Sequence, residues 1–83
     1  MERDEVQQNL NEVFRDVFDD KSLEVRDTMT AADVAGWDSL NHVTLIVAVE
    51  RRFGFRFTTK EVSSLKNVGE MIDLIQSKKK SGA

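Results

Sequence analysis

The amino-acid sequence predicts an all-α fold, a small four-helix bundle with three longer helices, one short helix and a long loop between helices 1 and 2. Apolar residues recur at intervals of three and four in four segments, which is the period of an amphipathic helix. Two of these segments open on a Thr or Asn followed three residues later by Glu, the pattern of a capping box. The chain has 83 residues and no proline, and this length is typical of one small domain. We expect residues 1–77 to form that domain and residues 78–83 to form a basic, disordered tail.

The first helix is predicted from six apolar residues that make one stripe over three turns: Val6, Leu10, Val13, Phe14, Val17 and Phe18. Its other face is polar, and we expect the helix to end near Asp19 and Asp20. Residues 20–37 lack a sustained period, so they predict a long loop that Leu23, Val25 and Met29 attach to the core. A loop of this length in so small a domain is typical of a functional segment or of a crossover between elements.

The second helix is predicted over about residues 39–52. Asp38 is a suitable N-cap, which places Ser39 in the first helical turn. Gly54 is expected just after the last helical residue, where a left-handed backbone favours glycine. Apolar residues cover so much of this helix that we expect it to touch neighbours on more than one side. They are Leu40, Val43, Leu45, Ile46, Val47, Ala48, Val49 and Phe53.

The last two helices are predicted from their capping boxes. Thr58 and Glu61 open a short third helix, and Asn67 and Glu70 open a fourth. Between the second and third helices, residues 55–57 alternate apolar and polar side chains, but no other segment could pair with them as a strand. We therefore interpret them as an extended connector that buries its two phenylalanines.

Composition excludes several classes of function. There is no cysteine and a single histidine, so disulfides, thiolate metal sites and multi-histidine metal sites are excluded. The longest apolar run, Leu45–Val49, is far shorter than the roughly 20 residues that a membrane helix needs, and no secretory segment is visible. The lysines at 78–80 form the only basic run, and a run without aromatic partners does not indicate nucleic-acid binding. We expect a cytoplasmic monomer without membrane insertion.

Ser39 allows three interpretations from the residues alone. As a nucleophile it would need His42 as its base, but two residues on adjacent turns of one helix do not easily allow a third group to orient the imidazole. It could also be simply a favourable residue at a helix start. Finally, a hydroxyl in the first turn lies where the helix dipole stabilises an attached phosphodiester. So small a chain has little room for a complete active site, which argues against an enzyme.

The segment "GWDSLNHVTLIVAVERRFGFRFT" resembles the modification site and second helix of an acyl carrier protein. The resemblance includes Asp38-Ser39-Leu40, the glycine stop at Gly54, the apolar connector after it, and "LKNVGEMIDLI" as the last helix. Within the second helix it includes Val43, Leu45, Ala48, Val49, Glu50 and Phe53 at the family's spacing. It extends over about residues 4–77.

This resemblance implies that Ser39, with Asp38 and Leu40 beside it, receives a 4′-phosphopantetheine arm donated by coenzyme A. The partner that adds the arm would be a phosphopantetheinyl transferase of the holo-acyl-carrier-protein synthase type. Acyl groups would then be carried as thioesters on the arm's thiol and presented to acyl-loading, elongating or acyl-transfer enzymes. The chain itself would be a carrier and not a catalyst. The acyl chain would be sheltered between the second and third helices.

The second helix departs from the pattern of fatty-acid-synthesis carriers, whose corresponding helix is strongly acidic. From Ser39 to Phe53 the only acid is Glu50, and the segment has a formal charge of +1 with His42 neutral. Because complementary charges select partners, we interpret the chain as a specialised carrier of a polyketide-like or other dedicated acyl pathway. The residues predicted to contact partners are Leu40, Asn41, Val43, Thr44, Val47, Glu50 and Arg51.

Two alternatives remain open at this point. An aminoacyl or D-alanyl carrier would share the fold, although an aminoacyl carrier more usually has a Gly-Gly-x-Ser pattern, where this chain has Gly-Trp-Asp-Ser. An unmodified carrier-like domain could act purely as a protein-interaction module. We expect Trp37 to cover the start of the second helix, and His42 to be a partner contact or a solvated side chain.

Overall fold

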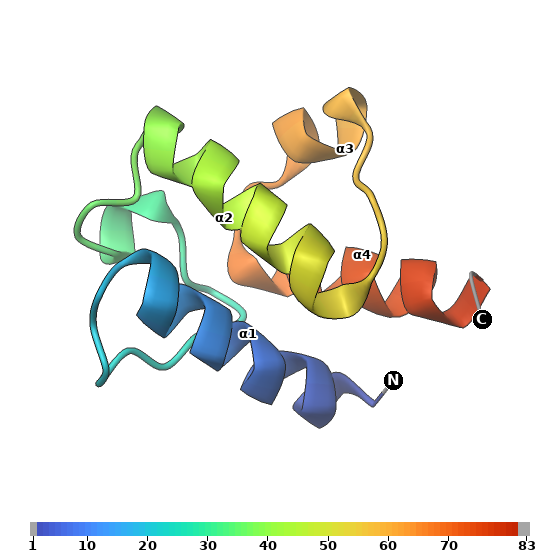
Figure 1. Cartoon of the computed structure of the whole chain (residues 1–83), viewed down its shortest axis with the longest axis horizontal. Coiled ribbons are helices and arrows are strands. Elements are labelled where there is room, and N and C mark those ends of the chain that lie inside the picture. Colours follow the sequence, from blue (N-terminus) through green and yellow to red (C-terminus); the bar gives the residue numbers. More distant parts are fainter. Residues whose placement is uncertain (1, 82–83) are drawn as a thin grey trace.

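The computed structural model of the chain describes residues 2–81, and within that range it confirms the predicted all-α fold (Figure 1). The described residues form four α-helices and one turn of 3₁₀ helix, and they contain no strand. The elements are α1 (Arg3–Val17), η1 (Ala31–Asp33), α2 (Ser39–Phe53), α3 (Thr59–Ser64) and α4 (Val68–Ser81).

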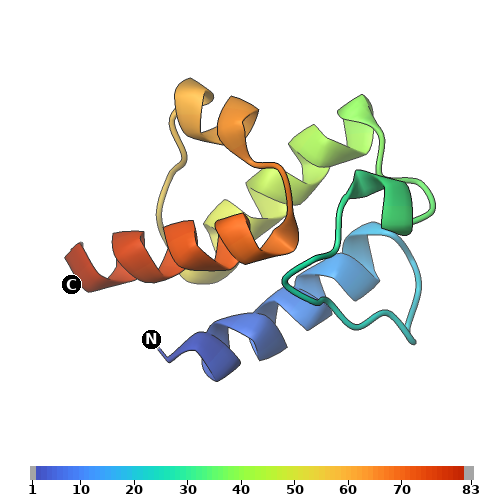
Figure 2. The ribbon, with the colours of Figure 1, turned by 180° about the vertical axis from the view of Figure 1, so that it is seen from behind.

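Helix α1 packs against both α2 and α4, which gives the bundle its core (Figures 1 and 2). Its predicted stripe is buried at Val6, Leu10, Val13 and Phe14, and it becomes half-buried toward the end of the helix. Each fully buried side chain of this kind contributes about 1.5–3 kcal/mol relative to an exposed one. Helices α2 and α4 supply the matching faces, with Leu45, Ile46, Val49 and Phe53 on α2 and Val68, Met71, Ile72 and Ile75 on α4.

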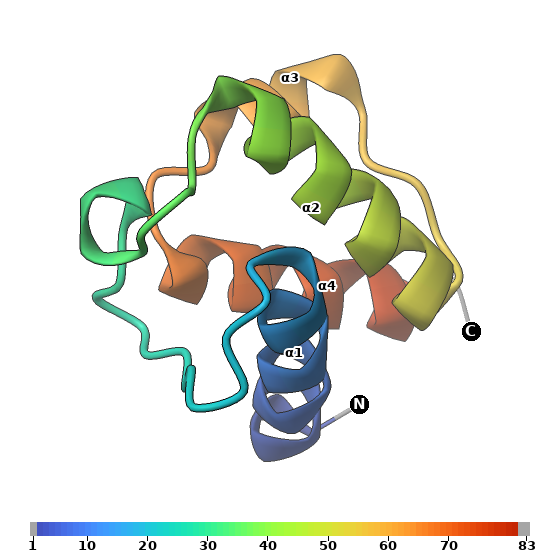
Figure 3. The same ribbon diagram turned by 60° about the vertical axis from the view of Figure 1, so that its left-hand side comes forward.

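The long loop between α1 and α2 runs along one end of the bundle and contains η1 (Figure 3). Val25 and Met29 are buried and Leu23 is half-buried, as the sequence predicted. The polar face of α1 also holds the loop. Asn11 accepts a hydrogen bond of 2.7 Å from the backbone N–H of Val25, and Gln7 donates one of 2.8 Å to the Val25 carbonyl.

The start of α4 is attached to the same loop through backbone groups. The N–H of Val68 donates to the carbonyl of Met29, at 2.9 Å, and the N–H of Gly69 donates to that of Asp27, at 3.0 Å. A Cβ at position 69 would lie 3.0 Å from the Asp27 oxygen, so a residue with a side chain would require the loop backbone to shift. These bonds satisfy donors that a helix start leaves without an intrahelical partner.

Both ends of α2 are as the sequence predicted. Asp38 is the N-cap, with its carboxylate accepting the backbone N–H of Asn41 at 2.8 Å. Gly54 ends the helix in the left-handed region, with φ of 77°, where a residue with a side chain would be strained.

Helix α3 has the predicted capping box and the weakest attachment to the core. Thr58 and Glu61 exchange the two capping hydrogen bonds. None of the residues of α3 is buried; Val62 packs on the core half-exposed, as does Leu65 just after the helix. The preceding connector is not a strand, as predicted, but Phe55 and Phe57 are only half-buried and meet edge to face at 5.0 Å.

Helix α4 continues past the boundary that the sequence suggested at residue 77. It runs through Ser81, since two of the lysines in this segment find acceptors. Lys78 forms an ion pair of 2.8 Å with Glu61, and Lys79 donates a 2.8 Å hydrogen bond to the carbonyl of Phe53 at the end of α2. Cations near the end of a helix are also favoured by the helix dipole. Residues 82–83 of the predicted tail lie outside the described part of the chain.

Candidate functional site

Ser39 is the first residue of α2 and its side chain is exposed. Asp38 holds the helix start in place by capping it, so the serine is presented on a rigid element directly after a long loop. No hydrogen bond engages the Ser39 hydroxyl within residues 2–81. The hydroxyl is therefore accessible to another protein and available for chemistry.

Trp37 covers the start of α2, as predicted. Its ring meets Phe14 of α1 edge to face, with ring centroids 5.3 Å apart, and it also contacts Phe18. The indole N–H donates a 3.1 Å hydrogen bond to Nδ1 of His42, and the planes of the two rings are nearly parallel, with an angle of 18° between them. Gly36 makes the preceding turn with φ of 88°, a conformation that favours glycine.

This contact argues against the nucleophile interpretation of Ser39. A catalytic histidine needs Nδ1 to donate to a group that orients the ring, usually a carboxylate. In this chain Nδ1 of His42 instead accepts from the indole of Trp37. The serine and histidine are close in sequence, but they are not assembled as a base and nucleophile.

A pocket of about 510 Å³ opens beside Ser39, between α2, α3 and the end of the long loop. Its apolar lining comes from Ala31, Trp37, Val62 and Leu65. Its polar lining comes from Asp38, Ser39, His42, Ser63 and Lys66. A flexible group attached to Ser39 would thus have both apolar surface and polar partners within the same hollow.

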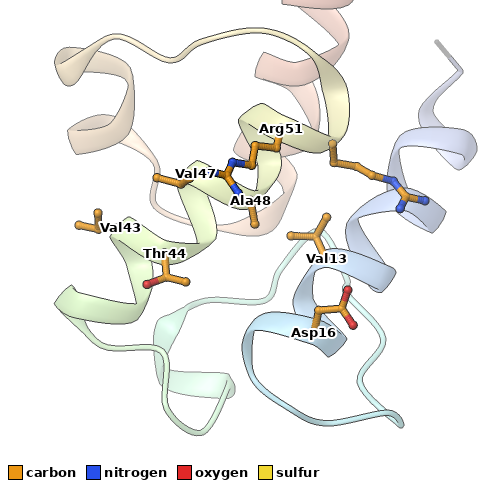
Figure 4. A pocket seen from close by; sticks show the side chains of 8 residues that line it. Val13, Asp16, Val43, Thr44, Val47, Ala48 and Arg51 are labelled. Carbon is orange, nitrogen blue, oxygen red and sulfur yellow. The ribbon is translucent and has the colours of Figure 1, made fainter.

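A second pocket, of about 590 Å³, lies between α1 and α2 (Figure 4). Val43, Thr44, Val47, Ala48 and Arg51 of α2 line one wall, as Figure 4 shows, and Val13 and Asp16 of α1 line the other. Arg52 also contributes, but its guanidinium is paired with Glu12 at 2.7 Å.

Three large apolar residues are exposed in the described chain, and all lie on α2. Leu40 is 76% exposed, Val43 60% and Val47 42%. They form one row that begins next to Ser39 and ends at the second pocket. The sequence could not decide whether these residues were core or surface, and the packing makes them surface.

The other predicted partner residues divide into two groups. Thr44 and Arg51 are exposed. Asn41 and Glu50 are half-buried and bonded within the chain, because the Asn41 amide donates to the Gly36 carbonyl and the Glu50 carboxylate accepts the Phe57 N–H at 2.8 Å. The exposed side of α2 is therefore almost free of carboxylates beyond its cap.

The described residues contain neither a membrane-spanning helix nor a cluster of metal-binding side chains. No helix there is long and apolar enough to cross a membrane. Within the same range, no group of three or more His, Cys, Asp or Glu side chains is arranged to hold a metal ion.

Comparison with known proteins agrees with this site. The family model described as a phosphopantetheine attachment site matches residues 8–75. The acyl carrier protein of Coprothermobacter proteolyticus is 30% identical over 77 residues, which are 93% of this chain and 94% of that protein. The acyl carrier protein of Acidothermus cellulolyticus is 32% identical over 75 residues, 90% of this chain and 89% of that protein.

Among solved structures, the holo acyl carrier protein from Geobacter metallireducens, determined by solution NMR, superposes with a TM-score of 0.83. It is 40% identical, and the match covers 88% of this chain and 84% of that one.

The chain therefore belongs to the phosphopantetheine-attachment family, as an acyl carrier protein. It is a carrier and not an enzyme, and the cofactor of this class is a covalently attached phosphopantetheine. As a carrier it is expected to interact with enzymes that handle acyl groups.

Sequence reasoning missed two features of this site. It did not predict the hydrogen bond between Trp37 and His42, because their spacing of five residues crosses a loop–helix boundary and has no fixed geometry. It also did not predict that Asn41 and Glu50 turn inward, since polar residues on a helix are usually solvated. In both cases the partner belongs to a loop whose path the local pattern does not define.

Proposed function

We propose that Ser39 is the attachment residue for 4′-phosphopantetheine and that the chain presents acyl groups on that arm to the enzymes of a specialised pathway. The observation behind the attachment residue is the position of Ser39. Its side chain is exposed, its hydroxyl makes no hydrogen bond within the described chain, and it is the first residue of a 15-residue helix whose cap is intact. The matched family region, residues 8–75, includes it.

The residues around Ser39 suit a phosphodiester and a pantetheine arm. The backbone N–H groups at the start of α2 favour an anion on the Ser39 oxygen. Lys66 adds a positive charge across the pocket, and Trp37, Val62 and Leu65 offer apolar surface along which an arm could lie. Asp38 keeps the first turn formed while its neighbour is modified.

When bound, the cofactor supplies a thiol that forms thioesters, which a chain without cysteine does not provide itself. The chain's own part is to hold the attachment oxygen at a defined place and to offer a surface for docking. The row Leu40, Val43 and Val47, with Thr44 and Arg51 beside it, is the surface that we assign to partners.

The charge of this surface supports a specialised pathway. Of the charged side chains on α2, Glu50 and Arg52 are bonded within the molecule, which leaves Arg51 as the exposed one without a partner among the described residues. A partner with a basic docking patch would meet an apolar row and a cation, whereas a partner with apolar and acidic residues would be complementary. This argument favours a dedicated polyketide-like or other acyl pathway over general fatty-acid synthesis.

The attachment is tested by intact mass after incubation with coenzyme A and a broad-specificity phosphopantetheinyl transferase. We expect the wild-type chain to gain the mass of one phosphopantetheine. Ser39→Ala should gain nothing, and Ser63→Ala, which alters a serine lining the same pocket, should gain as much as wild type. No gain in the wild type, while a known carrier is fully converted, would support the unmodified interaction module instead.

The specialised pathway is tested by exchanging the charge of α2. The double variant Thr44→Glu, Arg51→Glu would give the helix an acidic exposed face. We expect holo protein carrying these changes to be acylated and elongated by general fatty-acid-synthesis enzymes with a lower KM than wild type. Equal KM values for the two proteins would count against a role for the charge of α2. Loading with amino acids alone, in a screen of acyl and aminoacyl donors, would indicate the aminoacyl or D-alanyl alternative.

A further inference from the structure

His42 has a defined orientation that neither capping nor core packing requires. Its Nδ1 accepts a 3.1 Å hydrogen bond from the indole N–H of Trp37. An indole N–H can only donate, so Nδ1 of His42 has to be the acceptor. In a neutral imidazole the other nitrogen then carries the proton. The contact therefore selects the tautomer with the hydrogen on Nε2.

Trp37 also restricts the position of the imidazole ring. The two ring planes are nearly parallel, with an angle of 18° between them and centroids 6.1 Å apart, so the hydrogen bond joins the rings edge to edge. The indole is itself held by Phe14, which is fully buried in the core, and by Phe18. The core residue Phe14 thus positions Trp37, and Trp37 in turn orients His42.

His42 lies one helical turn after Ser39, and both residues line the same pocket. Residues three apart on a helix are neighbours on its surface. The charged groups that line this pocket with them are Asp38, which is used as the N-cap, and Lys66 from the segment before α4. With Nδ1 occupied by Trp37, Nε2–H is the group of His42 that is available to a ligand in the pocket.

We infer that His42 is a positioning residue for the arm, with Nε2–H donating a hydrogen bond to the phosphodiester formed on Ser39. This inference rests on the proposed attachment at Ser39. Trp37 acts through His42 by fixing the tautomer and ring orientation. The result is an arm whose first segment is directed along the pocket between α2 and α3 instead of rotating freely about the serine.

The competing explanation is that the Trp37–His42 contact only fastens the loop to α2. Three variants separate the two roles. His42→Phe keeps an aromatic ring against Trp37 but has no donor, and His42→Gln replaces the ring with a side chain that both accepts and donates. Trp37→Phe keeps an aromatic ring on Phe14 but removes the N–H that selects the tautomer.

The readouts are ³¹P NMR of the phosphodiester and ¹⁵N NMR of the imidazole, both recorded at alkaline pH. Intact mass first verifies the modification of each protein, and circular dichroism verifies its folding. In wild-type apo protein we expect Nε2 protonated and Nδ1 as acceptor, and the Nε2 resonance should move when the arm is attached. The ³¹P resonance should shift in His42→Phe and return toward the wild-type position in His42→Gln. In Trp37→Phe the two nitrogens should show averaged tautomers, with an intermediate ³¹P position.

An identical ³¹P resonance in wild type, His42→Phe and His42→Gln would overturn the inference while leaving attachment at Ser39 intact. The inference would also be overturned if the ³¹P resonance shifted in Lys66→Met but not in His42→Phe. The lysine would then be the partner of the phosphate. If the wild type gains no mass, the proposed attachment fails, and this inference fails with it.

Discussion

At the residue scale, Asp38 has the most direct structural effect on the site, because its carboxylate caps the helix that presents Ser39. The cap is a single hydrogen bond of 2.8 Å to the N–H of Asn41. Asn41 in turn donates its side-chain amide to the carbonyl of Gly36, so the helix start and the turn before it are held together. Losing the cap would loosen both.

We expect Asp38→Ala to lower the free energy of unfolding by about 1 kcal/mol, within the range of about 0.5–2 kcal/mol seen for lost N-caps. Asp38→Asn should lose much less, because its amide oxygen can still accept the hydrogen bond. Urea unfolding followed by circular dichroism measures both. If the two variants lost equal stability, the charge of Asp38 and not its capping bond would be the stabilising factor.

At the element scale, two faces of α1 make different structural contacts. Its apolar stripe enters the core, while three polar residues at intervals of four hold the long loop: Gln7, Asn11 and Arg15. Arg15 donates to the carbonyl of Leu23 at 2.7 Å, and the other two bond the backbone of Val25. The loop therefore keeps its path even though it contains only one turn of helix.

We expect Asn11→Ala to destabilise the chain by about 1–3 kcal/mol, because the part-buried N–H of Val25 loses its acceptor. The amide of Val25 should also exchange with solvent faster. Gln8→Ala is the matched control, since Gln8 is an exposed neighbour on the same helix and should change stability by no more than about 0.5 kcal/mol. Similar losses in both variants would show that helix propensity, not the loop contact, is being measured.

At the scale of the whole molecule, a few polar contacts join segments that are distant in sequence. Arg3 pairs with Asp27 in the loop and Asp73 in α4, so that one side chain bridges three segments. Lys78 of α4 pairs with Glu61 of α3. Because α3 has no buried residue, this ion pair and the half-exposed Val62, which packs on the core, hold α3 beside the pocket.

The Glu61 contact predicts a pH dependence of stability. The hydrogen bond from Lys78, followed by that from the Thr58 N–H, lowers the pKa of Glu61 below its ordinary value of 4.5. A carboxylate whose pKa is lowered by folding contributes stability that is complete above the ordinary pKa and is lost as the pH falls through the folded one.

We therefore expect Glu61→Gln to be less stable than wild type at neutral pH, with the difference shrinking as the pH falls below 4.5. Thermal unfolding of both proteins across this range measures the convergence. A constant difference at all pH values would mean that the glutamate acts through packing or helix capping and not through its charge.

Local chemistry made much of this fold predictable from the sequence. The cap at Asp38, the stop at Gly54 and the capping box of Thr58 and Glu61 depend on residues at most four positions apart, so no knowledge of the tertiary structure is needed. The end of α4 was harder to predict, because Lys78 and Lys79 stabilise it through acceptors on α3 and α2.

The sequence by itself determined the helices, their boundaries to within a few residues, and the serine at the start of α2 that the family resemblance singled out. Only the tertiary structure decided which apolar residues of α2 are core and which are surface. All of them satisfy a helical period, but only one side of α2 faces the buried core, which leaves Leu40, Val43 and Val47 exposed. The tertiary structure likewise decided that Trp37 orients His42, since that contact depends on how the long loop returns to α2. Helix formation is governed by neighbours along the chain, whereas exposure and orientation are governed by neighbours in space.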